Sequence, residues 1–164
     1  MIPASRQESA QIWTVLQQGI NRRKMEGSNQ WQDGYPNFQT VLDDIENGFG
    51  YLFYHHDKII GYAALVYNFE PAYDLIKGQW KNNDDFYVIH RLCIDEEFLG
   101  KGLSTQLMLL VEDFVRAKKC FNIKVDTNFD NLAMLHIFEK LSYVYCGEVE
   151  FRGSPRKAFQ KVLE

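Results

Sequence analysis

Cysteine, proline and long hydrophobic runs are scarce in this chain of 164 residues, which contains three cysteines and four prolines. Cys93, Cys120 and Cys146 lie far apart and form no CxxC pair, so the sequence predicts neither a disulfide framework nor a metal site. We expect reduced thiols in a cytoplasmic protein. No apolar run approaches the roughly 20 residues that span a bilayer, and the first residues lack the apolar segment of a signal peptide. The sequence therefore predicts no membrane partner.

An excess of positive charge is also missing, because 18 Lys and Arg residues stand against 22 Asp and Glu, for a net charge of -4. A mildly acidic chain has no general attraction to nucleic acid, and we expect no nucleic-acid partner. Any anionic ligand must then be held by a local site. With 46% hydrophobic residues, the length suits a single domain over residues 1–164 with a core of its own.

Hydrophobic periodicity predicts both helices and strands. The expected helices cover residues 8–23, 38–47, 103–119 and 131–141. The expected strands cover residues 51–54, 59–69, 86–94, 121–125, 143–151 and 157–163, and the pattern allows one further short first strand. Residues 70–85 are a polar excursion between strands. The third helix carries an apolar stripe of Leu103, Leu107, Leu110, Val111, Phe114 and Val115. This order predicts a mixed α/β fold built in layers.

The turn between the strand over 86–94 and the third helix has the composition of an anion site. It reads Leu99-Gly100-Lys101-Gly102-Leu103-Ser104. The first N–H groups of a helix have no internal partner, and glycine lets an anion approach the main chain. Hydroxyls of Ser104 and Thr105 and the charge of Lys101 could add to the site. GxG alone equally indicates a tight turn, and the run is neither a Walker P-loop nor a complete dinucleotide fingerprint.

The run from Arg91 to Phe114 resembles the coenzyme-binding motif of the GNAT superfamily of N-acetyltransferases, whose signature is [QR]xxGx[GA]. Two positions depart from it, since Leu99 replaces Gln or Arg and Ser104 replaces Gly or Ala. Residues 126–143 resemble the second motif of the family. Residues 30–36, 89–91 and 153–156 resemble a group of uncharacterised bacterial members. The resemblance implies a central, mostly antiparallel sheet with a splayed parallel strand pair and helices on both faces.

The same resemblance implies acetyl-CoA as co-substrate, bound by residues of both motifs. The pyrophosphate would lie on the backbone of the glycine turn, and the pantetheine would pair with the preceding strand. The N–H of Leu92 would polarise the thioester carbonyl. The implied coenzyme-binding residues are Leu92, Cys93, Ile94, Leu99, Gly100, Lys101, Gly102, Leu103, Ser104, Thr105, Asn131, Met134 and Phe138. We expect Cys93 to act here as a small core residue and not as a nucleophile.

His90 is the candidate general base, because an attacking amine must lose a proton. Side chains alternate along a strand, which would place Val88, His90 and Leu92 on one face. His90 is then the only titratable residue on that face of the strand. A buried, hydrogen-bonded structural histidine is the alternative.

The general acid is where the sequence departs most from the family. Many members use a tyrosine seven residues after the motif asparagine, and this chain has Phe138 there. Tyr143 is the candidate replacement, with Tyr145 beside it, although both could be core aromatics. Protonation of the thiolate by water is the other alternative.

Acceptor recognition is expected from two variable segments. Trp31 and Tyr35 lie in the loop of residues 28–37, which we call the acceptor loop. Glu70 and Tyr73 lie in the polar excursion. Acidic groups there would attract a cationic amine, and the alternative is solvated loop charges with aromatics that cover the core.

The sequence thus predicts an N-acetyltransferase that transfers acetyl from acetyl-CoA to a primary amine by direct attack. The amine would belong to a small molecule, an amino acid or a protein. One alternative is a CoA-binding sensor without turnover, favoured by Phe138. Another is a nucleotide-binding domain that uses the same turn. Family members often pair through their C-terminal strands, so the resemblance also allows a homodimer.

Overall fold

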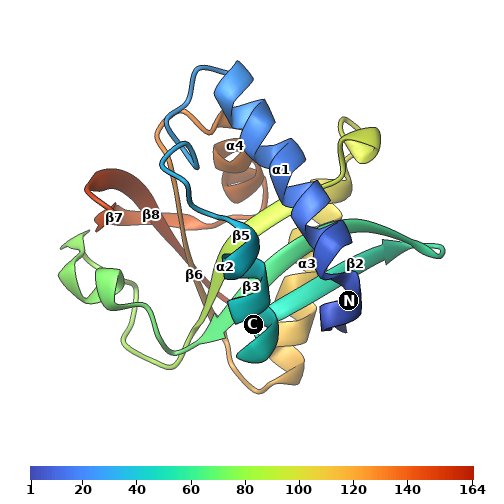
Figure 1. Cartoon of the computed structure of the whole chain (residues 1–164). Helices are drawn as coiled ribbons and strands as arrows, with labels where there is room; N and C mark the ends of the chain where they lie inside the picture. The colour runs from blue at the N-terminus through green and yellow to red at the C-terminus, as the bar shows by residue number, and fades with distance from the viewer. The chain divides into compact units, whose positions relative to one another are not determined.

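The computed structural model describes all of residues 1–164 (Figure 1). Its internal contacts divide the chain into two compact units. Unit 1 comprises Met1–Leu65 and His90–Leu110, and unit 2 comprises Val66–Ile89 and Val111–Glu164. The elements β3 (Lys58–Tyr67), β5 (Tyr87–Ile94) and α3 (Leu103–Ala117) run from one unit into the other. The single domain over 1–164 stays a prediction, and each unit is described by itself.

The strands form one sheet in the order β1-β2-β3-β5-β6-β8-β7-β4. β5 pairs in parallel with β6 (Asn122–Thr127) through Tyr87↔Ile123 and Val88↔Lys124. The pairs β1–β2, β2–β3, β4–β7, β6–β8 and β7–β8 are antiparallel. The predicted mixed α/β class, with a mostly antiparallel sheet and one parallel pair, is confirmed.

Unit 1 holds β1 (Ile2–Pro3), η1 (Arg6–Glu8), α1 (Ser9–Met25), α2 (Phe38–Glu46), β2 (Gly50–His55) and η3 (Glu96–Phe98). Figure 1 shows α1 and α2 over the ribbon of β2 and β3. Ile12 and Leu16 of α1 and Val41 of α2 pack against Leu52 and Tyr62 of these strands. Because these apolar residues recur at helical spacing, they place one stripe of α1 on the sheet.

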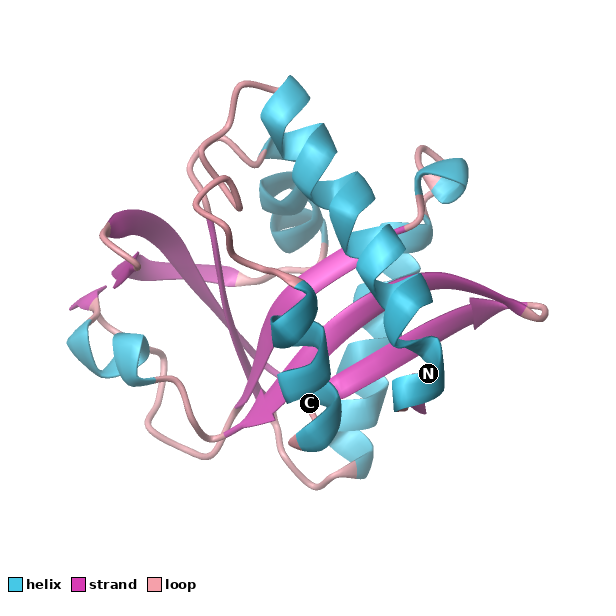
Figure 2. Ribbon diagram, in the orientation of Figure 1, coloured by secondary structure: helices cyan, strands magenta, loops and turns pink.

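Unit 2 holds η2 (Pro71–Leu75), β4 (Lys77–Gly78), β6, α4 (Leu132–Lys140), β7 (Val144–Phe151) and β8 (Ser154–Val162). Figure 2 shows β7 and β8 as a hairpin. Ile123 and Val125 of β6 and Phe138 of α4 are buried. The Phe138 ring lies 5.0 Å from that of Phe159 and 5.5 Å from that of Tyr143. This aromatic cluster joins α4 to the hairpin.

Two details differ from the predicted elements. Leu110, expected in the apolar stripe of α3, is 44% exposed, and Met108 is buried instead. The polar excursion contains a short helix, η2, and the short strand β4.

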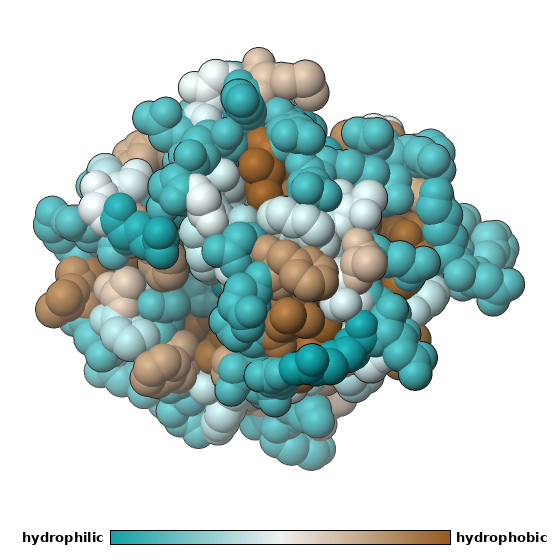
Figure 3. All heavy atoms as spheres, viewed as in Figure 1, coloured by the Kyte–Doolittle hydropathy of each residue, from teal (hydrophilic) through white to brown (hydrophobic).

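Apolar residues reach the surface in small groups between polar ones on the face drawn in Figure 3. The helices are all too short or too polar to cross a membrane.

Helix α1 approaches β5 most closely at Gly19. A Cβ built at residue 19 would lie 2.4 Å from Cys93 Sγ and 3.2 Å from the Trp31 ring. The Cys93 thiol is buried and donates to the carbonyl of Val15 at 3.4 Å. Burial raises the pKa of this thiol, so Cys93 is a small core residue that lets α1 settle on the strand.

Gly19→Ala is therefore expected to lower the free energy of unfolding, although alanine is the better helix former by about 1 kcal/mol. Overpacking costs about 1–3 kcal/mol, and the close sulfur places this site at the high end of that range. Urea unfolding measures the loss. In a Cys93→Ala background the penalty should shrink, because the clashing sulfur is gone. A Gly19→Ala protein as stable as the wild type would contradict the close contact.

Candidate functional site

Strand β5 is interrupted in its middle by Arg91, whose φ of 55° is in the left-handed region. The shared face of Val88 and His90 stays a prediction, because both precede this residue. Leu92 follows it, and a left-handed residue turns the chain out of the extended path. Three consecutive residues, His90, Arg91 and Leu92, are partly exposed to solvent. Val88 is fully buried. Such a break re-aims side chains and peptide groups and recurs beside active sites.

The Arg91 side chain is held by a buried carboxylate on α2. Its Nε and Nη2 donate to Asp44 at 2.8 and 2.5 Å, and the two side chains are only 8% and 5% exposed. The Tyr62 hydroxyl donates to the same carboxylate at 2.7 Å. Burial, and then the Asp44 charge, raise the pKa of Tyr62, so this phenol stays a neutral donor. The remaining nitrogen, Nη1, donates to the Tyr35 hydroxyl of the acceptor loop.

This arrangement explains how Arg91 keeps its conformation. A left-handed non-glycine residue costs roughly 1–3 kcal/mol and persists where its surroundings over-determine it. A bidentate arginine–carboxylate pair supplies two charge-assisted hydrogen bonds in fixed geometry. The Asp44 pair therefore offsets the cost of the break in β5.

The glycine turn has the backbone that the sequence predicts for an anion site. Asp95 caps η3 by accepting from Glu97 N at 3.0 Å, Leu99 is extended, and α3 begins at Leu103. Gly100 and Gly102 both have a φ of 73°, and nothing lies within 4 Å of a Cβ built at either. The first N–H groups of α3 have no partner inside the helix, and the glycine turn leaves open space directly before them. Alternating left-handed residues with unpaired N–H groups form an anion-binding concavity.

Lys101 does not point into this concavity. Its Nζ donates to the carbonyl of Glu97 at 3.0 Å and lies 5.2 Å from the centre of the Phe98 ring. The lysine side chain thus lies against η3 and connects the turn to it through these contacts. The anion site rests on backbone N–H groups, with the hydroxyls of Ser104 and Thr105 at the start of α3.

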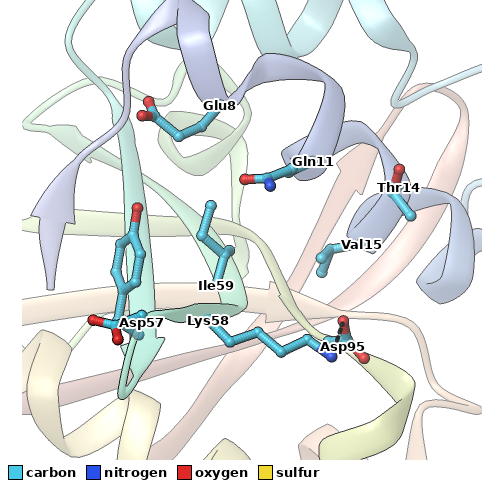
Figure 4. Close-up of a pocket in the computed structure, with 9 residues that line it drawn as sticks. Glu8, Gln11, Thr14, Val15, Asp57, Lys58, Ile59 and Asp95 are labelled. Carbon is cyan, nitrogen blue, oxygen red and sulfur yellow. Dashed lines mark ion pairs between the residues drawn. The ribbon is translucent and has the colours of Figure 1, made fainter.

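Unit 1 also has a cleft of about 410 Å³ that contains none of the predicted site residues. Glu8, Gln11 and Thr14 line one side, and Asp57, Lys58 and Asp95 the other, as Figure 4 shows. Lys58 lies 4.0 Å from Asp95 and 2.5 Å from Glu97. Its hydrogen bond with Glu97 raises the pKa of Lys58. The lysine charge is thus already paired with carboxylates, which makes this cleft a poor site for the phosphates of a coenzyme.

Residues 16–143 match the acetyltransferase (GNAT) family. The chain belongs to this family. A solved structure of a GNAT-family acetyltransferase from Streptococcus agalactiae 2603 is 33% identical, with a TM-score of 0.91, and the match covers 99% of this chain and 94% of the other. The uncharacterized N-acetyltransferase YesJ of Bacillus subtilis (strain 168) is 23% identical over 150 residues, which are 88% of this chain and 81% of YesJ.

A more distant solved neighbour is yncA of Salmonella typhimurium, a putative acetyltransferase whose structure includes its cofactor acetyl-CoA. It is 15% identical with a TM-score of 0.69, covering 99% of this chain and 92% of the other, and shares the fold. The family membership confirms the resemblance seen in the two motifs. It also confirms the enzyme class, an acetyl-CoA-dependent acyltransferase.

In this acetyltransferase, the second-motif residues of unit 2 have structural partners of their own. Asn131 caps α4 by accepting from Met134 N at 3.3 Å, and its side chain is mostly buried. Met134 is partly exposed on the same helix. Phe138 is fully buried in the aromatic cluster, where it fills the core of unit 2. Coenzyme contacts by these three residues stay predictions.

Tyr143 occupies a buried position beside charged groups. It is 6% exposed, and Lys161 lies 5.5 Å from the centre of its ring. Lys161 also binds the buried Glu112 at 2.7 Å. Burial, followed by the Glu112 charge, raises the pKa of Tyr143 well above its usual value. This environment favours a core role, and the proton-donor role of Tyr143 stays a prediction.

The four predicted acceptor residues have different environments. Tyr73 is 2% exposed and its hydroxyl donates to Asp126 at 2.7 Å, so this side chain is core and has little surface for a substrate. Glu70 caps η2 by accepting from Ala72 N at 3.3 Å. In unit 1, Trp31 and Tyr35 are partly exposed in the acceptor loop, and Trp31 lines a cleft of about 350 Å³. Sequence reasoning missed the Asp44 pair, because no local pattern marks it.

Proposed function

We propose that this protein transfers an acetyl group from acetyl-CoA to a primary amine by direct attack of the amine on the thioester. The observation that carries the proposal is the glycine turn, where Gly100 and Gly102, both with a φ of 73°, leave open space directly before the first N–H groups of α3. A pyrophosphate is a doubly charged anion of the size that such a concavity and a helix N-terminus stabilise. The neighbour yncA was solved with acetyl-CoA, which supports this choice of anion.

The chemistry proposed at β5 uses the residues on either side of the break. The N–H of Leu92 donates to the thioester carbonyl oxygen, where negative charge develops in the transition state. His90 takes the proton of the attacking amine, directly or through water. The pantetheine pairs with the backbone of Leu92, Cys93 and Ile94. The new bond is C–N, the broken bond is C–S, and CoA leaves as a thiolate.

Water is the proposed proton source for the leaving thiolate. Tyr143 is buried beside Glu112 and Lys161 in unit 2, and the Phe138 side chain has no ionisable proton to donate. An alkyl thiol of the cysteine kind has a pKa of about 8.5, so a released thiolate takes a proton from water near neutral pH. The reaction then needs no dedicated acid.

The acceptor is proposed to be a primary amine of a small molecule, an amino acid or a peptide. Tyr35 and Trp31 of the acceptor loop are its proposed contacts in unit 1. The cytoplasmic location and the homodimer stay predictions. A CoA-binding sensor is the second candidate, because Phe138 stands where many family members have a tyrosine donor and the candidate replacement, Tyr143, is buried.

Thiol release from acetyl-CoA tests the proposal, with a panel of lysine, spermidine and a short peptide with a free amino terminus. We expect release that depends on an added amine, and a His90→Gln variant that loses about 100-fold or more in rate, the scale of general base catalysis. His136, which is exposed on α4, provides the matched control as His136→Gln. CoA binding without release by any amine would favour the sensor. Binding of ATP or NAD in preference to CoA would defeat both.

A further inference from the structure

We propose that Arg91 is a positioning residue that ties the acceptor loop to β5 through the Tyr35 hydroxyl, so that this contact sets the affinity for the amine. The inference rests on the proposed function, because it assigns the acceptor loop to the amine. It adds a role for Arg91 and its carboxylate partner Asp44, neither of which is a predicted site residue.

The guanidinium is well placed to act as a fixed bracket. Arginine presents its donors in a rigid planar fork. Two of its nitrogens are used by Asp44 at 2.8 and 2.5 Å, which leaves Nη1 to donate to the Tyr35 hydroxyl. The Arg91 side chain is only 8% exposed. A charge-assisted hydrogen bond is stronger in such surroundings than in water. The two bonds to the Asp44 carboxylate fix the orientation of the guanidinium group.

The acceptor loop has a backbone that needs outside support. Trp31 has a φ of 64° and Gly34 a φ of 84°, and a bulky residue in the left-handed region persists only where its surroundings hold it. Several ties are internal, such as Tyr35 N to Asp33 at 3.2 Å and Asn37 Nδ2 to Gly34 O at 3.2 Å. The Tyr35–Arg91 bond instead leaves the loop and reaches a residue 56 positions away.

The position of Arg91 links the loop to the proposed chemistry. Arg91 is the left-handed residue of β5, and its neighbours are His90 and Leu92, the proposed base and the proposed carbonyl donor. One side chain therefore holds both the break in the strand and the loop that faces the amine. A loosened Tyr35 contact is expected to change amine binding before it changes coenzyme binding, because the glycine turn has its own capping.

Hydrogen exchange measured by mass spectrometry tests the tie without any substrate. In Tyr35→Phe we expect protection of amides 28–37 to fall about tenfold, the worth of one charge-assisted hydrogen bond, while β2 and α1 keep theirs. Tyr54→Phe is the matched control, since Tyr54 is 38% exposed and lies outside the loop. Unchanged exchange of the loop in Tyr35→Phe would overturn the proposal.

Kinetics with acetyl-CoA and the panel amine that gives the fastest thiol release test the link to the acceptor. We expect Tyr35→Phe to raise the KM for the amine about tenfold, with little change in the KM for acetyl-CoA. The double variant Tyr35→Phe/Arg91→Lys should have a KM for the amine no higher than that of Arg91→Lys alone. Additive losses would mean that Arg91 and Tyr35 affect amine binding independently of each other, which overturns the positioning role of Arg91. If no amine is turned over by the wild type, the proposed function fails, and the exchange experiment alone decides the tie.

Discussion

Gly102→Ala is expected to weaken CoA binding about 100-fold while the protein still folds. The Cβ of alanine would project from a left-handed residue into the open side of the turn, where nothing now lies within 4 Å. It would keep the phosphate oxygens from two or more backbone N–H groups. Two hydrogen bonds to a charged group, at about 1.5 kcal/mol each, amount to about two factors of ten in affinity. Titration calorimetry with CoA measures the change directly.

The chain offers a matched control for this experiment at Gly48. That residue has a φ of 70°, close to the 73° of Gly102, and it also has open space around a Cβ. It directly follows Asn47, the C-cap of α2, in a segment with no proposed coenzyme contact. In both variants, alanine in the left-handed region should therefore lower the free energy of unfolding by about 1–2 kcal/mol. Equal CoA affinity in the two variants would refute the anion site at the glycine turn.

Asp44→Ala is expected to be the most destabilising change, with a loss of about 3–5 kcal/mol in the free energy of unfolding. The reason is that Arg91 would be left as a buried charge without its carboxylate, and the Tyr62 hydroxyl would lose its acceptor. For a chain of this length such a loss lowers the melting temperature by roughly 6–20 °C. Thermal unfolding followed by circular dichroism measures it.

Two comparisons separate this effect from a general weakness of α2. The neighbouring Asp43 is exposed and its carboxylate accepts from Gln39 at 2.8 Å on the same helix, so Asp43→Ala should change stability by about 0.5 kcal/mol or less. In the double variant Asp44→Ala/Arg91→Met, part of the stability should return, because no buried charge remains unpaired. A loss below about 1 kcal/mol in Asp44→Ala would show that the pair contributes little.

The elements near the glycine turn could be predicted because their signals are local. An apolar strand, two glycines and an amphipathic helix follow one another within about thirty residues, and the turn between them is a matter of short-range backbone geometry. The predicted boundaries of the strand over 86–94 and of the third helix agree with β5 and α3 to within one or two residues. The match of residues 16–143 to the family extends this local signal to most of the chain.

The parts that could not be predicted depend on residues far apart in the chain. Arg91 meets Asp44 across 47 positions and Tyr35 across 56, and no periodicity brings these residues together. The left-handed conformation in the middle of β5 could not be predicted for the same reason, since Arg91 is held by partners that lie outside the strand. The burial of Tyr73 could not be predicted either, because its hydroxyl donates to Asp126, which lies 53 positions away in the chain.

By itself, the sequence determined the mixed α/β class, the family and the position of the glycine turn, because hydrophobic period, glycine placement and helix starts are encoded over a few neighbouring residues. The tertiary structure alone decided which titratable groups are buried, and with which partners. Burial placed Tyr143 beside Glu112 and Lys161, and the Asp44 carboxylate held the break in β5. The free energy of a buried charge depends on its neighbours in space, and those neighbours exist only once the chain has folded.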